Sequence, residues 1–514
     1  MPTLHEVIPR EYRDSVALMQ LSAALAKLPG IQQASAVMAT VNNLGLLGQA
    51  GMEIGKVAAG PNDLLIVVQG DEAALRPALE EAKARLAAKA AQPEGGAAKA
   101  LALRSIAMAL AAHSEANLAM ISTPGEYATA ETLKALQLGL NVMLFSNNVS
   151  GSDEAMLKRV ARDKDLIVMG PDCGTAIING IPLAFANVVK RGPIGAVGAS
   201  GTGLQEVTVL VDRLGSGISQ AIGTGGHDLS NEVGGISMLT GLQYLAEDPD
   251  TRVIVLISKP PSKEIAEAIL GKARASGKPV VVIFLGADAK ALTGGNIHGV
   301  RTLEDAARAA VALAQGRKPE PPDEAVHIPP GIPRLAPGQK FIRGLFSGGT
   351  FGFQATMLLQ EAAEVHSNTQ VGKSLPLKDM WKSVGHTLVD LGDDVFTRGR
   401  PHPMIDYRLR TERIVQEAGD PETALLLLDV VLGFGSNADP AAELAPALKK
   451  AREIAEKAGR AFVCVGHICG TDGDPQGFAS QARALQAAGM ILADSNAQAA
   501  RLARAIIEAG GGGA

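Results

Sequence analysis

The stretch Gly198-Ala-Ser-Gly-Thr-Gly203 decides the fold class of this chain. An apolar strand pattern that begins at Ile194 precedes it, and a helix pattern with Leu204 and Val207 on one face follows it. A glycine-rich turn between a strand and a helix is typical of α/β folds, and the free N–H groups at such a helix start attract anions. We therefore predict an α/β protein that binds phosphate at this turn. The predicted phosphate-binding residues are Ser200, Gly201, Thr202 and Gly203.

The C-terminal half contains a second turn of the same kind, Leu345-Phe-Ser-Gly-Gly-Thr-Phe-Gly352, followed by a helix pattern from Gln354 to Glu361. Similar strand patterns follow each turn in the same order, which predicts an internal duplication of one fold. Both turns are also compatible with a structural role, in which the glycines only let a strand and a helix pack closely. The predicted phosphate-binding residues of the second turn are Ser347, Gly348, Gly349 and Thr350.

Composition excludes several classes of function. The chain has 514 residues, 46% of them hydrophobic, which is enough for three or four domains. Its formal charge of -5 and its aromatic content of 3% argue against nucleic-acid binding. The first ten residues lack a signal-peptide pattern, and no apolar run approaches the roughly 20 residues that span a bilayer. We therefore expect a cytoplasmic protein that does not act at a membrane.

The three cysteines are too few for a disulfide framework in a chain of this length. Cys464-x-x-His467-x-Cys469 is similar to a metal motif, but it lies on or just after a buried-strand pattern and has no fourth ligand nearby. We predict buried thiols there and no metal site.

Strand and helix patterns divide the chain into four predicted domains. A small α+β domain comes first, an α/β block follows, and the two duplicated α/β blocks complete the chain. An Ala- and Gly-rich linker at Ala87–Ala98 and a proline-rich connector at Lys318–Gln339 separate some of these domains. The predicted boundaries are 1–90, 99–190, 191–316 and 340–508, the last with an insertion at 366–410.

A third glycine loop, Gly433-Phe-Gly-Ser-Asn-Ala-Asp-Pro440, lies at the expected carboxyl end of a strand. Asp439 can cap the following helix and Pro440 suits its first position, which would leave free amides for an anion. Ligands bind at this edge of open α/β sheets, although an ordinary capped loop explains the pattern equally well. The predicted phosphate-binding residues here are Gly433, Gly435, Ser436 and Asn437.

The predicted insertion concentrates charged residues in Asp390–Asp406, a segment stiffened by two prolines. Arg398 and Arg400 can present planar guanidinium groups to a carboxylate or phosphoryl group, and His402 can exchange protons near neutral pH. A surface network of ion pairs is the structural alternative. We predict that Arg398, Arg400 and His402 are catalytic, because the segment interrupts a duplicated domain at a place where the fold needs no insertion.

Four motifs resemble the FdrA family, within the succinyl-CoA synthetase superfamily. They are Val168-Met-Gly-Pro-Asp-Cys-Gly-Thr175, the first glycine turn, Glu232-Val-Gly-Gly-Ile-Ser237 and Gly399-Arg-Pro-His-Pro-Met-Ile-Asp406. The resemblance implies a degenerate, Rossmann-like CoA-binding domain in 99–190 and two flavodoxin-like domains fused in one chain. It also implies that two helix N-termini point at one phosphoryl group, beginning at 200–203 and at 433–437.

Two departures separate this chain from the ligases of the superfamily. The loop that carries a phosphorylated histidine in those enzymes resembles Gly286-Ala-Asp-Ala289 here, and the place of its supporting glutamate is taken by Ser258-Lys-Pro-Pro261. His298 comes only later, and no ATP-grasp domain is recognisable. A phosphohistidine mechanism is therefore not expected of this chain.

The resemblance implies a subunit of an oxamate carbamoyltransferase, which converts oxalurate and phosphate into oxamate and carbamoyl phosphate. We expect phosphate and carbamoyl phosphate as substrates, two further protein subunits or a homo-oligomer as partners, and no certain cofactor. Two alternatives stay open. One is an acyl-CoA synthetase that binds CoA, and the other is a non-catalytic metabolite-binding scaffold for partner subunits.

Overall fold

The computed structural model describes residues 1–52, 54–55, 57–90, 103–321, 324–398 and 400–510. It forms two compact units: Met1–Val149 with Asp393–Asp406, and Ser150–Gly392 with Tyr407–Ala514. The predicted linker Ala87–Ala98 lies partly outside the described residues, and its beginning belongs to a helix that continues to Ala90. None of the described helices is long and apolar enough to cross a membrane.

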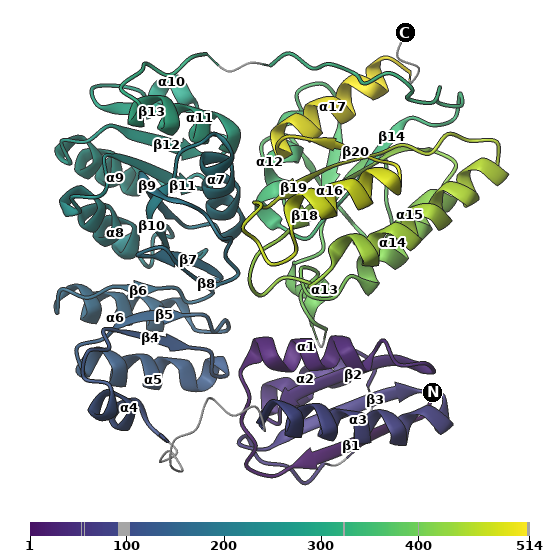
Figure 1. Cartoon of the computed structure of the whole chain (residues 1–514), viewed down its shortest axis with the longest axis horizontal. Helices are drawn as coiled ribbons and strands as arrows, with labels where there is room; N and C mark the ends of the chain where they lie inside the picture. Colours follow the sequence, from purple (N-terminus) through teal and green to yellow (C-terminus); the bar gives the residue numbers. More distant parts are fainter. Residues whose placement is uncertain (53, 56, 91–102, 322–323, 399, 511–514) are drawn as a thin grey trace. The chain divides into compact units, whose positions relative to one another are not determined.

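The first unit begins with the predicted small α+β domain, which the structure confirms. Its central strand β3 pairs antiparallel with β1 and β2. Side chains of β3 alternate between the two faces of this sheet, with Leu64, Ile66 and Val68 in one core and Leu65 and Val67 in the other. Helices α1 and α3 cover the first face of this sheet, and α2 lies over the second (Figure 1). The bounds are β1 Thr3–Ile8, α1 Ser15–Leu25, β2 Ile31–Met38, α2 Val41–Gln49, β3 Leu64–Gly70 and α3 Glu72–Ala90.

The same unit continues into short α/β segments, where β4 and β5 pair in parallel as their apolar patterns predict. It also includes the helical turn α13 from the predicted insertion. The bounds are α4 Ile106–Ala112, β4 Leu118–Ile121, α5 Gly125–Gln137, β5 Asn141–Leu144 and α13 Asp394–Thr397.

The second unit contains two seven-stranded sheets. The first has the order β13-β12-β11-β9-β10-β7-β8. Its five strands from β13 to β10 are parallel and follow the doubly wound flavodoxin-like order, whereas β7 and β8 form an antiparallel hairpin at one edge. The bounds are α6 Gly151–Arg162, β6 Val168–Met169, β7 Thr175–Ile178, β8 Ile181–Ala184, β9 Arg191–Gly198, α7 Gly201–Arg213, β10 Ile218–Gly223, α8 Ile236–Glu247, β11 Val253–Ser258, α9 Lys263–Ala275, β12 Val280–Phe284, α10 Ala289–Leu292, β13 Ile297–Gly299 and α11 Leu303–Ala314.

The second sheet has the order β16-β15-β17-β14-β18-β19-β20, and all its strand pairs are parallel. Strand β17 lies within the range predicted as an insertion, yet it pairs directly with β14 and is part of the sheet. Strand β19 covers Cys464–Cys469, and both of its thiols are buried, as the sequence pattern predicted. The bounds are β14 Phe341–Phe346, α12 Gly349–Leu359, β15 Val365–Ser367, β16 Leu375–Pro376, β17 His386–Asp390, α14 Arg408–Gly419, β18 Thr423–Val431, α15 Pro440–Lys457, β19 Cys464–Cys469, α16 Phe478–Ala487, β20 Met490–Ala493 and α17 Asn496–Glu508.

The two sheets exchange helix caps in a reciprocal way. Glu206 of α7 accepts a 3.0 Å hydrogen bond from the first amide of α17, at Asn496, and Gln354 of α12 accepts one of 2.8 Å from the first amide of α11, at Leu303. Glu206 and Gln354 each lie five residues after the start of their helix. This equivalence is what a duplicated fold with an internal two-fold relation produces.

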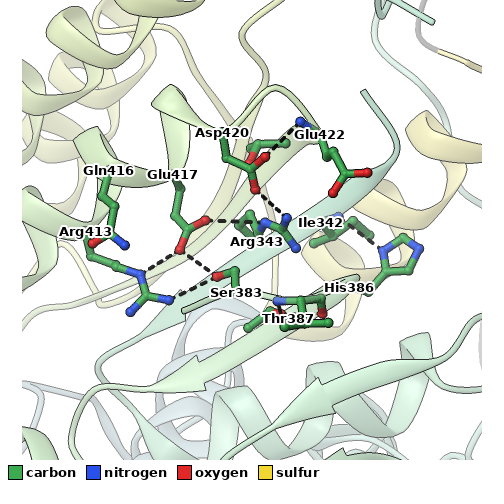
Figure 2. Close-up of polar contacts among 12 residues, drawn as sticks. Ile342, Arg343, Ser383, His386, Thr387, Arg413, Gln416, Glu417, Asp420 and Glu422 are labelled. Atoms are coloured by element: carbon green, nitrogen blue, oxygen red, sulfur yellow. Dashed lines mark hydrogen bonds and ion pairs between the residues drawn. The ribbon is translucent and has the colours of Figure 1, made fainter. Parts of the chain in front are cut away.

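A buried ion-pair network stabilises the N-terminal edge of the second sheet (Figure 2). Arg413 Nε donates to Glu417 Oε1 at 2.6 Å, and Ser383 Oγ donates to the same oxygen at 2.6 Å. Arg343 Nε lies 3.3 Å from the other oxygen of Glu417, and Arg343 Nη2 donates to Asp420 at 2.6 Å. Helix α14 is thereby joined to β14 at the end of the sheet opposite the glycine turns.

Candidate functional site

The structure brings the two glycine turns together at the carboxyl ends of β9 and β14. The hydroxyls of Ser200 and Thr350 share a hydrogen bond of 2.6 Å. A Cβ on Gly348 would lie 2.9 Å from Cγ2 of Thr202, so the backbone of the second turn packs against a side chain of the first. Helices α7 and α12 begin here, and their N-terminal ends both carry partial positive charge. Two predicted phosphate-binding turns therefore form one site.

The turn before α7 keeps free donors. Ser200 Oγ accepts from Gly203 N at 2.9 Å and caps the helix, and a Cβ on Gly203 would lie 2.6 Å from that hydroxyl. The amides of Gly201 and Thr202 have no hydrogen-bond partner among the residues that the structure describes. Gly201 is partly exposed. An anion beside Gly201 would find two amides and the positive end of α7.

The turn before α12 differs, because the chain's own carboxylate fills it. Asp429 of β18 accepts hydrogen bonds from Ser347 N at 2.8 Å, from Ser347 Oγ at 2.8 Å and from Gly348 N at 2.9 Å. Arg410 of α14 donates to the same carboxylate at 2.6 Å, and both charged side chains are completely buried. The donors predicted for phosphate at Ser347 and Gly348 are thus already engaged. Thr350 and Gly348 are the residues of this turn that face the first one, whereas Gly349 lies beside Asp390.

Sequence reasoning missed Asp429 and Arg410. The signal was present, because Asp429 is the only charged residue in the nine-residue apolar strand β18. Ile257 of β11 occupies the position in the first sheet that Asp429 occupies in the second, as the strand registers show, and isoleucine has no carboxylate. The two turns are therefore related in fold but different in electrostatics.

The third predicted loop, between β18 and α15, is held by side chains. Gly433 N donates to Gln476 Oε1 at 3.0 Å. Asp439 accepts from Ala442 N at 3.2 Å with Pro440 in the first turn of the helix, as predicted. The first amides of α15 are engaged, because Gln481 also accepts from Ala441 N at 2.8 Å. Anion binding by the loop before this helix stays a prediction.

The loop between β18 and α15 has an unusual backbone conformation at two glycines. Gly433 and Gly435 have φ values of +101° and +78°, which favour glycine. A Cβ on Gly435 would lie 2.9 Å from the Phe185 ring, so the loop packs on the segment before β9. The Ser436 hydroxyl oxygen is buried and has no hydrogen-bond partner in the described part of the chain. Asn437 accepts from Asp439 N at 2.9 Å and helps to form the cap.

Buried polar residues hold this face of the two sheets together, and no sequence pattern indicates them. Asn187 donates to Asp474 at 2.8 Å, and Gln205 of α7 donates to Asn187 at 3.0 Å. Desolvation raises the pKa of Asp474. Burial also opposes ionisation of Glu206, but His467 at 3.6 Å and the α17 amide lower the pKa of Glu206 below its ordinary value. The neighbouring copies are thus joined by hydrogen bonds that depend on both domains.

The three predicted catalytic residues lie in the first unit, whereas the glycine turns lie in the second. Arg398 and Arg400 are exposed, and neither has an ion pair or hydrogen bond from its side chain among the described residues. His402 Nδ1 accepts from Met404 N at 3.2 Å, and the His402 carbonyl accepts from Ile405 N at 2.8 Å. Residue 399 of the same motif lies outside the described residues.

The loop after β12 contains no histidine before α10. His298 lies in β13 instead, where burial lowers its pKa. No group of three His, Cys, Asp or Glu residues suited to a metal ion occurs in the described ranges.

Comparison with known families defines the class of this protein. Residues 345–506 match the CoA-ligase family, residues 189–286 match the CoA binding domain, and residues 1–102 match the family described as AllF, heavy metal-associated domain. The chain belongs to the succinyl-CoA synthetase-like family of CoA-binding and CoA-ligase domains. The CoA-binding match falls almost entirely outside 99–190, so the CoA-binding role predicted for that range stays a prediction.

One relative extends over nearly the whole chain. It is the uncharacterized protein YahF of Escherichia coli (strain K12), which is 44% identical over 505 residues and 97% of each chain. The alpha-2 subunit of the ADP-forming succinate–CoA ligase of Trichomonas vaginalis is 27% identical over 34% of this chain and 58% of that one. The sulfoacetate-CoA ligase subunit SauD of Bilophila wadsworthia is 28% identical over 33% of this chain and 59% of that one.

Solved structures resemble the chain only loosely. The dinucleotide-forming acetyl-coenzyme A synthetase 1 of Ca. Korarchaeum cryptofilum covers 77% of this chain, and 82% of that chain is covered, with 15% identity and a TM-score of 0.32. The finer resemblance to the FdrA family and its carbamoyltransferase activity remains a prediction.

Proposed function

We propose that this chain is a subunit of an acyl-CoA synthetase-type enzyme, and that it holds the phosphoryl group of an acyl phosphate between the starts of α7 and α12. The observation that carries this proposal is the 2.6 Å hydrogen bond between Ser200 and Thr350, which brings two helix N-termini to one place. The CoA-ligase and CoA-binding family matches support the same class of chemistry.

The hydrogen-bond donors at the two turns suit the transfer of an acyl group from a phosphoryl group. A phosphoryl group gains negative charge on its oxygens as an acyl group leaves it, and fixed amides that point at those oxygens stabilise this charge. The free amides of Gly201 and Thr202 would supply that stabilisation, with the two hydroxyls as adjustable partners. Asp429 neutralises Arg410 and keeps the second turn rigid without adding net charge to the site.

Adding a methyl group at Gly201 tests the phosphate site. A Cβ there lies 3.2 Å from Oγ1 of Thr175 and stands beside the free amides. We expect Gly201→Ala to weaken the affinity for inorganic phosphate about tenfold, a typical cost of crowding a close-packed position. Isothermal titration calorimetry measures this change. Gly271→Ala in α9 is the matched control, because a Cβ at Gly271 has no neighbour within 4 Å. Equal affinity in all three proteins would reduce the turn to a packing element.

Carbamoyl transfer is the second candidate function. The specific observation in its favour is the absence of a histidine between β12 and α10, where the resembling ligases carry their phosphorylated residue. Transfer of a carbamoyl group between an oxalurate-like substrate and phosphate needs a phosphate cradle and a carboxylate clamp, but no phosphohistidine. Arg398 and Arg400 are exposed, and their side chains have no hydrogen-bond or ion-pair partner in the described part of the chain, so both are suited to such a clamp. Two partner subunits and a cytoplasmic location belong to this proposal and rest on the sequence alone.

One experiment separates the two candidates. The chain is purified with its native partners and assayed for thioester formation from an acyl phosphate and CoA, and for consumption of carbamoyl phosphate with oxamate. Thioester formation or acid-labile phosphate on the chain would favour the ligase-type function. Carbamoyl phosphate consumption alone would favour carbamoyl transfer. If the chain binds phosphate but shows no turnover with or without its partners, both catalytic candidates are rejected and the non-catalytic scaffold is supported.

Arg400→Lys tests the clamp. Lysine keeps the charge but cannot form the paired hydrogen bonds of a guanidinium group. We expect turnover of the assembled enzyme to fall at least about tenfold, or roughly 1.4 kcal/mol of transition-state stabilisation, with an unchanged melting temperature. Arg274→Lys on α9, another exposed arginine, should leave turnover unchanged. Full activity of Arg400→Lys would show that the Arg-Pro-His-Pro segment is structural.

A further inference from the structure

A small cavity lies at the other end of α12 from the glycine turns. Its volume is about 210 Å³, and its walls come from the end of α12, from α17, from the residues before α11 and from the proline-rich connector. At 1.5 Å per helical residue, the cavity is roughly 15 Å from the start of α12. It is therefore separate from the proposed phosphoryl site. The residues that matter for its chemistry are Arg301, Glu324, Leu358, Leu359, Arg501 and Arg504.

The arginines of this cavity are not equally paired. Arg301 contacts Glu361, and Arg504 Nε donates to Glu508 at 2.7 Å. Arg501 has only 11% of its side chain exposed, and its Nη2 atom is buried without a hydrogen-bond partner among the described residues. A largely buried guanidinium nitrogen without an acceptor is costly, so this arginine favours an added anion.

The carboxylates near Arg501 do not meet that need. Glu324 of the connector lies 3.6 Å away, beyond hydrogen-bond distance, and its side chain is 60% exposed. The same carboxylate lies 3.9 Å from Arg301. Glu361 and Glu508 also line the cavity, but they pair with Arg301 and Arg504. Asp305 of α11 is engaged as well, because it accepts from Thr302 N at 3.1 Å in the capping box of its own helix. Glu324 is thus a loosely held neighbour that a ligand could replace at little cost.

We propose that this cavity binds a small carboxylate whose head group lies on Arg501 and Arg301 and whose apolar body lies on Leu358 and Leu359. Glu324 acts as a built-in competitor for the same arginines. A short-chain monocarboxylate matches both the charge and the apolar wall. Because Arg301 precedes α11 of the first copy and Arg501 belongs to α17 of the second, the bound ligand would link the two duplicated domains. This proposal is independent of the proposed acyl-transfer function.

Sodium propionate is the probe, and titration calorimetry of the full chain against matched sodium chloride is the measurement. We expect saturable binding that Arg501→Gln abolishes. Glu324→Gln should tighten the propionate Kd about three- to fivefold, as expected when a partly exposed ion pair no longer competes. Arg162→Gln is the matched control, because this exposed arginine on α6 pairs with Asp163 and lies outside the cavity. It should bind propionate like the wild type.

A structural role for Arg501 gives a different result. Arginine near the end of α12 would offset the negative end of that helix dipole, so Arg501→Gln would then lower the melting temperature without affecting any ligand. The proposal is overturned if propionate does not bind the wild type or Glu324→Gln. It is also overturned if Arg501→Gln binds propionate with unchanged affinity. Melting curves of all variants show whether a loss of binding reflects unfolding.

Discussion

Replacing Asp429 with alanine is expected to lower the free energy of unfolding by about 3–5 kcal/mol, because the change leaves a buried charge without its partner. Arg410 would lose its counter-ion inside a fully buried site. Ser347 N, Ser347 Oγ and Gly348 N would lose their acceptor at the same time. Denaturant unfolding followed by the fluorescence of Trp381 measures the effect. Trp381 is the only tryptophan of the chain and lies in the same domain.

Added formate tests whether the stability lost in Asp429→Ala comes from the missing carboxylate. The alanine variant keeps the three donors and the guanidinium group around a space that a small carboxylate can fill, so added formate should restore much of the lost stability. Asp429→Asn is the matched control, because its side chain fills the same space and leaves no room for formate. Formate that stabilises the wild type and both variants equally would contradict the assignment of Asp429 as an internal anion. Asp429→Ala that unfolds like the wild type would contradict the buried ion pair itself.

Replacing Glu417 with glutamine is expected to destabilise the same domain by about 3–5 kcal/mol, since it leaves two buried arginines around a neutral side chain. Arg413 and Arg343 both contact this carboxylate, and Ser383 donates to it (Figure 2). Trp381 is a suitable probe here also, because its carbonyl accepts from Gln416 of the same helix at 3.2 Å. The midpoint of the denaturant transition should fall.

Helix α14 offers a matched control for this change. Glu412 is an exposed residue of the same helix, so Glu412→Gln should change stability by no more than about 0.5 kcal/mol. If both variants unfold at the same denaturant concentration, the network in Figure 2 does not stabilise the domain. A chain with two compact units is not expected to unfold in one step, so the comparison uses the transition that Trp381 reports.

Local sequence patterns predicted the elements that depend on neighbouring residues. Asp439 caps α15 as expected, because a cap is formed between residues three positions apart. The cap of Ser200 on α7 is equally local, although Ser200 was predicted only as a phosphate ligand. The apolar runs gave β9, β11, β12, β14 and β18, since a strand buried on both faces needs a continuous apolar sequence. The bounds of β19 follow from its pairing with β18, so a local apolar pattern does not determine them.

Residues that act across the fold could not be predicted in this way. Nothing near Asp429 in sequence indicates that it accepts from Ser347, which is 82 residues away. The pairing of Ser200 with Thr350 spans 150 residues and depends on how two domains pack. Strand β17 was missed because its range has charged and polar residues on both sides, and its place beside β14 follows from the register of the sheet.

The sequence by itself determined the fold class, the duplicated glycine turns and the helix starts that follow them, because each depends on backbone conformation and apolar periodicity within about twenty residues. Tertiary structure alone decided which turn can accept an anion. Both turns have similar glycines, but a buried carboxylate from a distant strand fills the second and an isoleucine leaves the first free. Charge neutralisation inside a protein depends on distances between side chains, and only the folded chain sets those distances.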